Sequence, residues 1–347
     1  MDRYIGLDVH QTSCTLAIVG PSGRRLGSQV VETNGQALVE AIRAIPKPRH
    51  AVMEEGTQSA WLYEVLSPHV DELVVAGISQ SRGPKSDARD AFGLADALRL
   101  GAIATPVFKA PSRFAMLREL GRVYSMISRD VVRTQNRIKA QYRSRGVQTS
   151  SSVYSQSGRQ DGLSKLPVPS RAAAALLYGE LDALRALKKQ AHCELVSESR
   201  HHPIAQVLRT CPGLGDIRVA QLIPVVVTPE RFRTARQFWS YCGLGIVMRS
   251  SSDWVRQDDR WIRSQTAKTR GLNPCHNSTL KVVFKGAATT VITKLEHEPL
   301  RKDYERLLAQ GTKPNLAKLT LARKIAATAL SMWKHQEVYD PARHRKQ

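Results

Sequence analysis

In the first third of the chain, segments whose hydrophobic residues have the spacing of a β-strand are followed by segments with the spacing of an α-helix. Residues 3–9 and 14–19 are short runs rich in β-branched residues, and a turn at 21–23 separates them from a third run at 26–33. This spacing predicts three antiparallel strands at the start of the chain.

Helix and strand patterns then alternate as far as residue 101. Helical spacing is found over 36–45, 58–70 and 86–101, and short buried-strand runs are found over 50–55 and 71–77. The order βββαβαβ, followed by a further helix, predicts a mixed-sheet α/β domain over residues 1–110.

The next part of the chain is helical and basic. Residues 112–145 show an uninterrupted helical pattern with regularly placed arginines, and residues 146–170, rich in serine, glycine and glutamine, indicate a linker. Leucines between 177 and 195 recur at helical spacings, which indicates an antiparallel helical hairpin, packed within the monomer or forming an oligomerising coiled coil. We assign residues 111–200 to the long basic helix, the linker and the hairpin.

A mostly helical domain is expected over residues 201–300, followed by a C-terminal helix and a basic tail over 301–347. In it a Pro-Gly-Leu-Gly turn between two helical stretches resembles a helix-hairpin-helix. Gly213 and Gly215 would let backbone N–H groups approach a DNA phosphate, and an ordinary interhelical turn is the alternative. The fold class expected for the whole chain is α/β plus α.

The net charge of the chain indicates that its binding partner is a polyanion. The 347 residues include 52 lysines and arginines against 30 acidic residues, a formal net charge of +22. Arginines on the long helix suit phosphates, and tryptophans interleaved with cations suit base stacking. The expected nucleic-acid contacts are Arg129, Arg133, Arg137, Arg249, Trp254 and Trp261.

The cysteines and the hydropathy of the chain indicate the cellular compartment of the protein. The five cysteines are scattered and never form C-x-x-C, so neither a disulfide framework nor a zinc site is indicated. No apolar run approaches the roughly 18 residues that span a bilayer, and no secretory leader opens the chain. We expect a protein of the reducing cytoplasm without a membrane partner.

Four acidic residues on three predicted elements indicate a metal site. Asp8 ends the first strand, Glu54 follows a later apolar run, and Asp87 and Asp90 lie in the first turn of a helix. Crowded carboxylates persist mainly where Mg²⁺ or Mn²⁺ takes up their charge, and paired metals suit displacement at phosphate. Glu55 competes with Glu54, because neighbouring strand residues point to opposite faces. With the element order, these acids resemble the arrangement of RuvC-like or RNase H-like domains.

The same motifs occur in order in a known family. IGLDVH, VMEEGT, KSDARDA, CPGLG and the segment from CGLG to SSS match over roughly residues 3–290. The chain resembles the bridge-RNA-guided insertion-sequence transposases, which have a DEDD-type RuvC-like domain and a serine-bearing C-terminal transposase domain. The resemblance implies that Asp8, Glu54, Asp87 and Asp90 bind divalent metal.

The resemblance also implies a serine nucleophile. Counting on from Gly243 of the Gly-Leu-Gly turn reaches Ser251, with Ser250 and Ser252 as alternatives in register. The glycine that usually follows this serine in the family is absent, and Asp253 follows the triplet. Taken alone, the triplet is typical of a surface loop.

Excision and insertion of a mobile element is the implied activity. A noncoding bridge RNA would pair with donor and target double-stranded DNA, and subunits would assemble as a dimer or tetramer. The long basic helix would suit RNA binding.

Three other functions stay open at this point. A structure-specific endonuclease would need the acids for metal-assisted hydrolysis but no serine. A non-catalytic nucleic-acid-binding protein would use the acids structurally. A sugar kinase or actin-like ATPase shares the Gly-Leu-Asp motif near an N-terminal hairpin, but the chain lacks the later glycine-rich phosphate loops, and its charge argues against this class.

Overall fold

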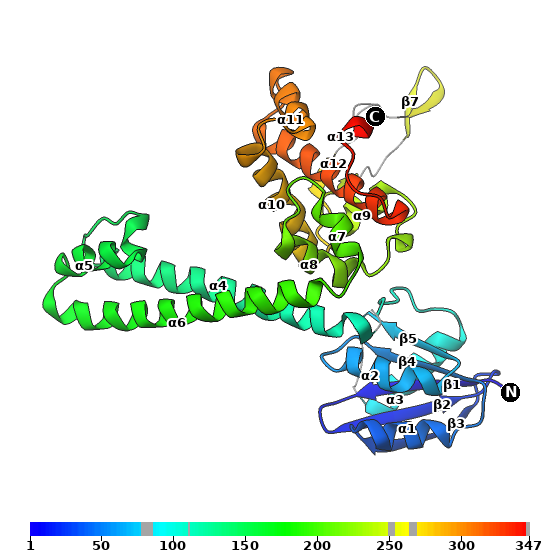
Figure 1. Cartoon of the computed structure of the whole chain (residues 1–347). Coiled ribbons are helices and arrows are strands. Elements are labelled where there is room, and N and C mark those ends of the chain that lie inside the picture. The colour runs from blue at the N-terminus through cyan, green and yellow to red at the C-terminus, as the bar shows by residue number, and fades with distance from the viewer. Residues whose placement is uncertain (78–85, 110–111, 249–253, 264–268, 345–347) are drawn as a thin grey trace. The chain divides into compact units, whose positions relative to one another are not determined.

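A computed structural model describes residues 1–77, 86–109, 112–248, 254–263 and 269–344. The chain forms two compact units, Met1–Ser112 and Arg113–Gln347 (Figure 1). Each unit has its own buried hydrophobic residues. In the described part of the chain, no helix combines the length and hydrophobicity needed to cross a bilayer.

The first unit is built on a five-stranded mixed sheet. Its strands are β1 (Arg3–Val9), β2 (Ser13–Val19), β3 (Arg25–Glu32), β4 (Arg49–Glu54) and β5 (Glu72–Ala76), in the spatial order β3-β2-β1-β4-β5 (Figure 1). β1, β2 and β3 pair antiparallel, whereas β4 runs parallel to β1, and β5 to β4. The predicted antiparallel opening is confirmed, and the C-terminal ends of β1 and β4 lie side by side.

Two helices and a short 3-10 helix accompany one face of this sheet. They are α1 (Gly35–Arg43), α2 (Ser59–Leu66) and η1 (Ser67–His69). Leu38 of α1 and Leu62 of α2 are fully buried in one core cluster with Ile5 and Leu7 of β1. Burying apolar side chains of this size is the main source of stability for such a layer.

Helix α3 (Asp87–Arg99) lies on the opposite face, against β1. Alternate strand residues face opposite sides, so Gly6 faces away from the core that holds Ile5 and Leu7. A Cβ atom at Gly6 would lie 2.8 Å from the backbone nitrogen of Ala95 in α3. The absence of a side chain at Gly6 therefore lets α3 pack directly on β1.

The second unit begins with a helical arm. The 3-10 helix η2 (Ser112–Phe114) leads into α4 (Ala115–Arg143), which packs against α6 (Val168–Ser199) in the same chain. Their shared core contains Ile138 and Leu181, and the buried hydroxyls of Tyr142 and Tyr178 lie 3.0 Å apart. The basic segment thus forms one long helix, α4, and the leucine-bearing segment forms one helix, α6, that packs against α4 within the monomer.

The prediction of a linker over residues 146–170 is wrong for much of this segment. It holds η3 (Ser151–Tyr154) and α5 (Gln156–Ser164). Two of its serines cap these elements, since the Ser150 and Ser155 side chains accept hydrogen bonds from the backbone N–H groups of Ser152 and Gly158. Val153 is buried in the core of the arm, so serine content here reflects capping.

The remainder of the second unit is mainly helical. Its helices are α7 (Ile204–Arg209), α8 (Asp216–Val226), η4 (Pro229–Arg231), α9 (Ala235–Tyr241), α10 (Ser278–Lys294), α11 (Pro299–Ala309), α12 (Pro314–His335) and α13 (Pro341–His344). Ile223, Phe284 and Ile325 from three of these helices are fully buried. The prediction that this region is mostly helical is confirmed.

Four short strands in this region were not predicted. β6 (Ile246–Met248) pairs with β9 (Thr269–Leu272), and β7 (Trp254–Gln257) forms a hairpin with β8 (Arg260–Arg263). The hairpin turns at Asp258 and Asp259, which have φ values of 47° and 60°. Aspartate tolerates the positive φ that a two-residue hairpin turn requires.

Candidate active site and nucleic-acid surfaces

The four predicted acids come from the three elements named by the sequence. Asp8 is the penultimate residue of β1, Glu54 ends the neighbouring β4, and Asp87 and Asp90 lie in the first turn of α3. Leu7 of β1 lies opposite Met53 of β4 in the parallel register, so the next residues of the two strands, Asp8 and Glu54, reach the same edge of the sheet.

The carboxyl group of Asp8 is affected by its burial and by the charges around it. Burial raises the pKa of its carboxyl, and the negative charges of Asp87, Asp90 and Glu54 raise it further, while His10 lowers it. Carboxylates that disfavour one another's charge in this way are stabilised by a bound cation. The structure therefore places Asp8 and Glu54 at one sheet edge, and Asp87 and Asp90 on the helix packed against β1.

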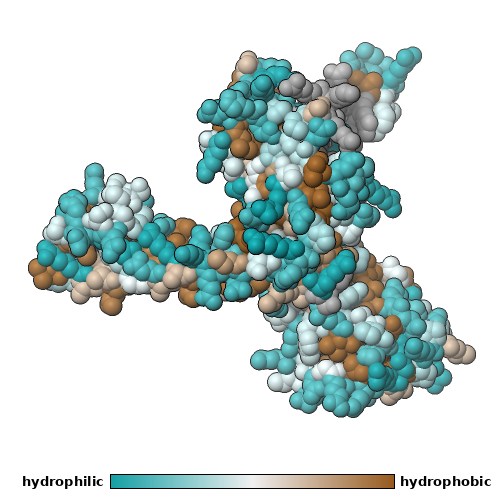
Figure 2. Space-filling view, in the orientation of Figure 1, coloured by the Kyte–Doolittle hydropathy of each residue, from teal (hydrophilic) through white to brown (hydrophobic). Residues whose placement is uncertain are grey.

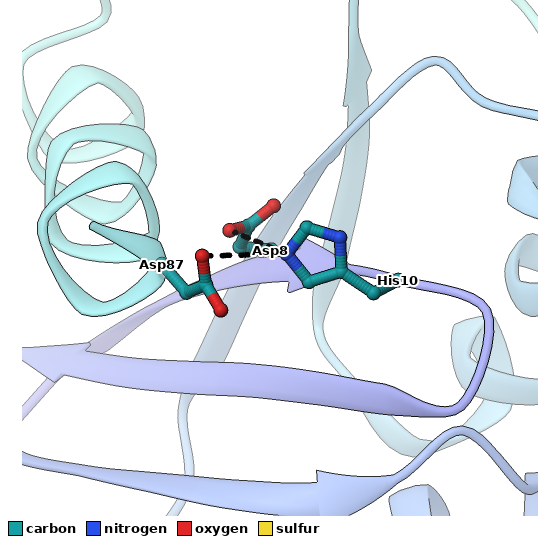
Figure 3. Close-up of side chains that lie close together, drawn as sticks. All are labelled: Asp8, His10 and Asp87. Carbon is teal, nitrogen blue, oxygen red and sulfur yellow. Dashed lines mark ion pairs between the residues drawn. The ribbon is translucent and has the colours of Figure 1, made fainter. Parts of the chain in front are cut away.

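His10 is a member of this cluster that sequence reasoning missed. It follows β1, and its Nε2 atom lies 3.4 Å from Asp8 Oδ2 and 3.4 Å from Asp87 Oδ1 (Figure 3). Among the described residues, ligand atoms of these three side chains lie within 4.8 Å of one another. Carboxylate oxygens with one imidazole nitrogen are a donor set that fits a divalent cation. The signal available in the sequence was the histidine two residues after Asp8.

The choice between Glu54 and Glu55 depends on Lys109. Its ammonium group, on a side chain only 8% exposed, forms an ion pair with Glu55 and donates a hydrogen bond to Ser59 Oγ at 2.8 Å. Glu54, and not Glu55, is among the carboxylates that raise the pKa of Asp8. The geometry therefore favours Glu54 as the fourth acid of the cluster.

A cavity of about 440 Å³ adjoins the acids. It is lined by Asp8, Val9, His10, Gln11, Glu54, Glu55, Gly56, Thr57, Gln58, Ser59 and Leu62. The loop after β4 forms one wall, and its Ser59 side chain donates to the carbonyl of Gly56 at 2.8 Å. A substrate group could enter here beside the carboxylates.

The predicted nucleophile lies in a segment that the structure does not describe. Ser251, its alternatives Ser250 and Ser252, and Arg249 lie outside the described residues, between β6 and β7.

The three predicted arginines of α4 are exposed on the arm. Arg133 forms an ion pair with Asp130 at 2.9 Å, and Arg137 with Glu180 of α6 at 3.2 Å. Hydrophilic residues cover much of the arm in Figure 2, with hydrophobic ones among them. Exposed ion pairs contribute little stability, so these guanidinium groups can be diverted to phosphates at small cost.

The two glycines of the predicted helix-hairpin-helix turn differ in their surroundings. Gly213 has a φ of +81°, and a Cβ there would lie 2.5 Å from the carbonyl oxygen of Ala287 in α10. Its close approach is therefore to the protein's own backbone. Gly215 is exposed and precedes α8 directly, so phosphate contact at this helix N-terminus stays a prediction.

The hairpin of β7 and β8, which we term the Trp ribbon (residues 254–263), presents aromatic and basic side chains together. Arg256 lies opposite Trp261, and Trp254 shares their face two residues earlier. These side chains are 64%, 66% and 58% exposed, and Arg256 forms an ion pair with Asp259 at 2.7 Å. Exposed indoles beside a guanidinium suit stacking on bases and contact with phosphate.

Comparisons with known proteins cover both units. A model of DEDD transposases of the IS110 type matches residues 5–144, and a model described as the transposase IS116/IS110/IS902 family matches residues 205–305. A Streptomyces clavuligerus protein, the insertion element IS116 uncharacterized 44.8 kDa protein, is 22% identical to this chain. The alignment, 399 residues long with its gaps, covers 98% of this chain and 96% of that protein. The four acids lie in the first matched segment and the Trp ribbon in the second. The chain belongs to the IS110/IS116 family of transposases.

Proposed function

We propose that this transposase cleaves and rejoins DNA at a divalent-metal centre held by Asp8, Glu54, Asp87 and Asp90, to excise and insert a mobile element. The proposal is supported by the parallel register that brings Asp8 and Glu54 to the same sheet edge and by the shared contact of Asp8 and Asp87 with His10. The strand order β3-β2-β1-β4-β5 supports a RuvC-like assignment for the first unit.

These acids would hold the cation. Mg²⁺ or Mn²⁺ bound there would supply Lewis-acid stabilisation of the charge that develops on a phosphodiester. Asp8, on the central strand β1, and Asp87, on the helix packed against that strand, would supply two of the ligands. Lys109 neutralises Glu55 and so keeps that carboxylate from competing with Glu54.

We assign the nucleophile to Ser251, with Ser250 and Ser252 as alternatives. Its Oγ would form a bond to phosphorus while one ester bond of the DNA strand breaks and the released end takes up a proton. Attack on this phosphoserine by the hydroxyl of another strand would release the serine and join the DNA. The support is the resemblance of the CGLG to SSS segment to the family.

The basic and aromatic surfaces of the second unit are assigned to nucleic-acid binding, and the exposed apolar residues of the arm to contact with a second subunit. Double-stranded DNA at the element ends and target, and a bridge RNA, would contact Arg129, Arg133 and Arg137 and the Trp ribbon, as the net charge of +22 favours. Exposed apolar residues on the arm, such as Leu176 at 78%, support assembly as a dimer or tetramer.

The test is strand cleavage and joining with the co-purified RNA and DNA that carries the element ends. Asp8→Asn should abolish both steps. Ser251→Ala should abolish cleavage, joining and the trapped protein–DNA adduct, while Ser157→Ala, an exposed serine of α5, serves as the control.

Three results would change the assignment. Normal cleavage and joining by Ser251→Ala would exclude this serine, and the same variants at 250 and 252 would then locate the nucleophile or exclude the triplet. Metal-dependent cleavage without any adduct would indicate hydrolysis by an endonuclease. Nucleic-acid binding without metal binding would indicate a non-catalytic protein.

A further inference from the structure

His10 occupies the gap between two of the acids. Its Nε2 atom lies at 3.4 Å from oxygens of both Asp8 and Asp87 (Figure 3). Two ligand atoms bonded to one ion at about 2.1 Å lie at most about 4.2 Å apart, so these separations fit a shared ion. The same ring nitrogen faces both carboxylates.

The backbone holds this histidine in place. The N–H of His10 donates to the carbonyl of Ser13 at 2.9 Å, and Thr33 Oγ1 donates to the carbonyl of His10 at 2.9 Å. The N–H of Thr33 in turn donates to the carbonyl of Thr12 at 3.0 Å. The turn between β1 and β2 is thereby tied to the end of β3, and the imidazole is presented from a fixed position.

His50, on β4 of the same sheet, has the arrangement of a simple ion pair and serves as a comparison for His10. His50 also lies between two carboxylates, but Glu72 approaches its Nδ1 at 3.0 Å and Asp2 approaches its Nε2 at 4.0 Å. Carboxylates on opposite ring nitrogens cannot share one ion with that ring. The convergence on a single nitrogen at His10 is the arrangement that a metal ligand requires.

We propose that His10 binds the divalent ion directly through Nε2, beside Asp8 and Asp87, and that this nitrogen makes the centre favour Mn²⁺ over Mg²⁺. The inference rests on the proposed metal-dependent function. Mg²⁺ takes oxygen ligands and retains water, whereas imidazole is a better ligand for first-row transition ions. Loss of the imidazole should therefore weaken Mn²⁺ binding about ten-fold or more, and Mg²⁺ binding much less.

The test is pulsed electron paramagnetic resonance of the full chain with one equivalent of Mn²⁺. A directly bound histidine gives a ¹⁴N coupling, which we expect in the wild type and in His50→Ala and not in His10→Ala. His10→Asn gives a second variant with a polar side chain, and circular dichroism checks that each protein folds. Calorimetry with Mn²⁺ and with Mg²⁺ measures the change in selectivity.

The outcomes separate this inference from the proposed function. Binding of Mn²⁺ that is lost in Asp8→Asn but shows no ¹⁴N coupling in the wild type would overturn the role of His10 and leave the metal centre intact. A coupling that persists in His10→Ala would also overturn it. Absence of Asp8-dependent Mn²⁺ binding would overturn both.

Discussion

Replacing Gly6 with alanine is expected to move the acids of α3 away from Asp8. The new methyl would lie 2.8 Å from the nitrogen of Ala95 and 2.9 Å from the carbonyl carbon of Ala91, with the Ala91 oxygen closer still. Contacts between non-bonded carbon atoms are normally about 3.5–4.0 Å, and the oxygen is closer than either of these atoms, so α3 must shift by at least about 1 Å. Gly6 does not have a positive φ, so the clash alone is tested.

The expected losses follow from this shift. Overpacking of a tight contact costs about 1–3 kcal/mol of stability, and misplacing catalytic groups by about 1 Å lowers activity about 100-fold. Thermal denaturation, Mn²⁺ calorimetry and strand cleavage measure these effects. Gly27→Ala on β3 is the matched control, because a Cβ there meets nothing within 4 Å. Wild-type metal affinity and cleavage in Gly6→Ala would refute the reasoning.

Three further predictions concern stability, binding and reactivity. Arg49→Lys should lower the free energy of unfolding by about 2–3 kcal/mol in urea, because lysine cannot serve all three backbone carbonyls that the guanidinium binds; an unchanged midpoint would contradict this. Trp261→Ala should weaken single-stranded nucleic-acid binding about ten-fold by fluorescence anisotropy, and Trp61→Ala, in the first unit, should not. Burial, with a contribution from Asp8, raises the pKa of Cys14 to about 12, so its thiol should resist iodoacetamide at pH 8 in the native protein. The exposed thiols that should react, by mass spectrometry, are Cys193 and Cys275.

The first unit was largely predictable because its signals are local. Strand runs, turns and helix starts specify the element order, and Asp8, Asp87 and Asp90 follow from their places at element ends. Glu54 is preferred to Glu55 in the sequence because it directly follows an apolar run, whereas the ion pair of Glu55 with Lys109 forms only in the folded chain. His10 was missed because its partner Asp87 is brought close only by the packing of α3 on β1.

The second unit was harder to predict for similar reasons. Serines that suggested a linker are helix caps, and this becomes visible only when Val153 is seen buried against the arm. The Trp ribbon has strands of four residues each, too short for a clear period, and turns on two aspartates without glycine. Gly213 suggested a phosphate contact, whereas its φ and its contact with α10 account for the glycine.

The most direct test of the central claim is anomalous diffraction from crystals of this chain grown with Mn²⁺. The account predicts a peak at the sheet edge within about 2.0–2.2 Å of carboxylate oxygens of Asp8 and Asp87, with Glu54 and Asp90 around it. Asp8→Asn crystals should lack that peak. A Mn²⁺ peak elsewhere, with none between β1 and α3, would contradict the claim that these acids form the metal centre.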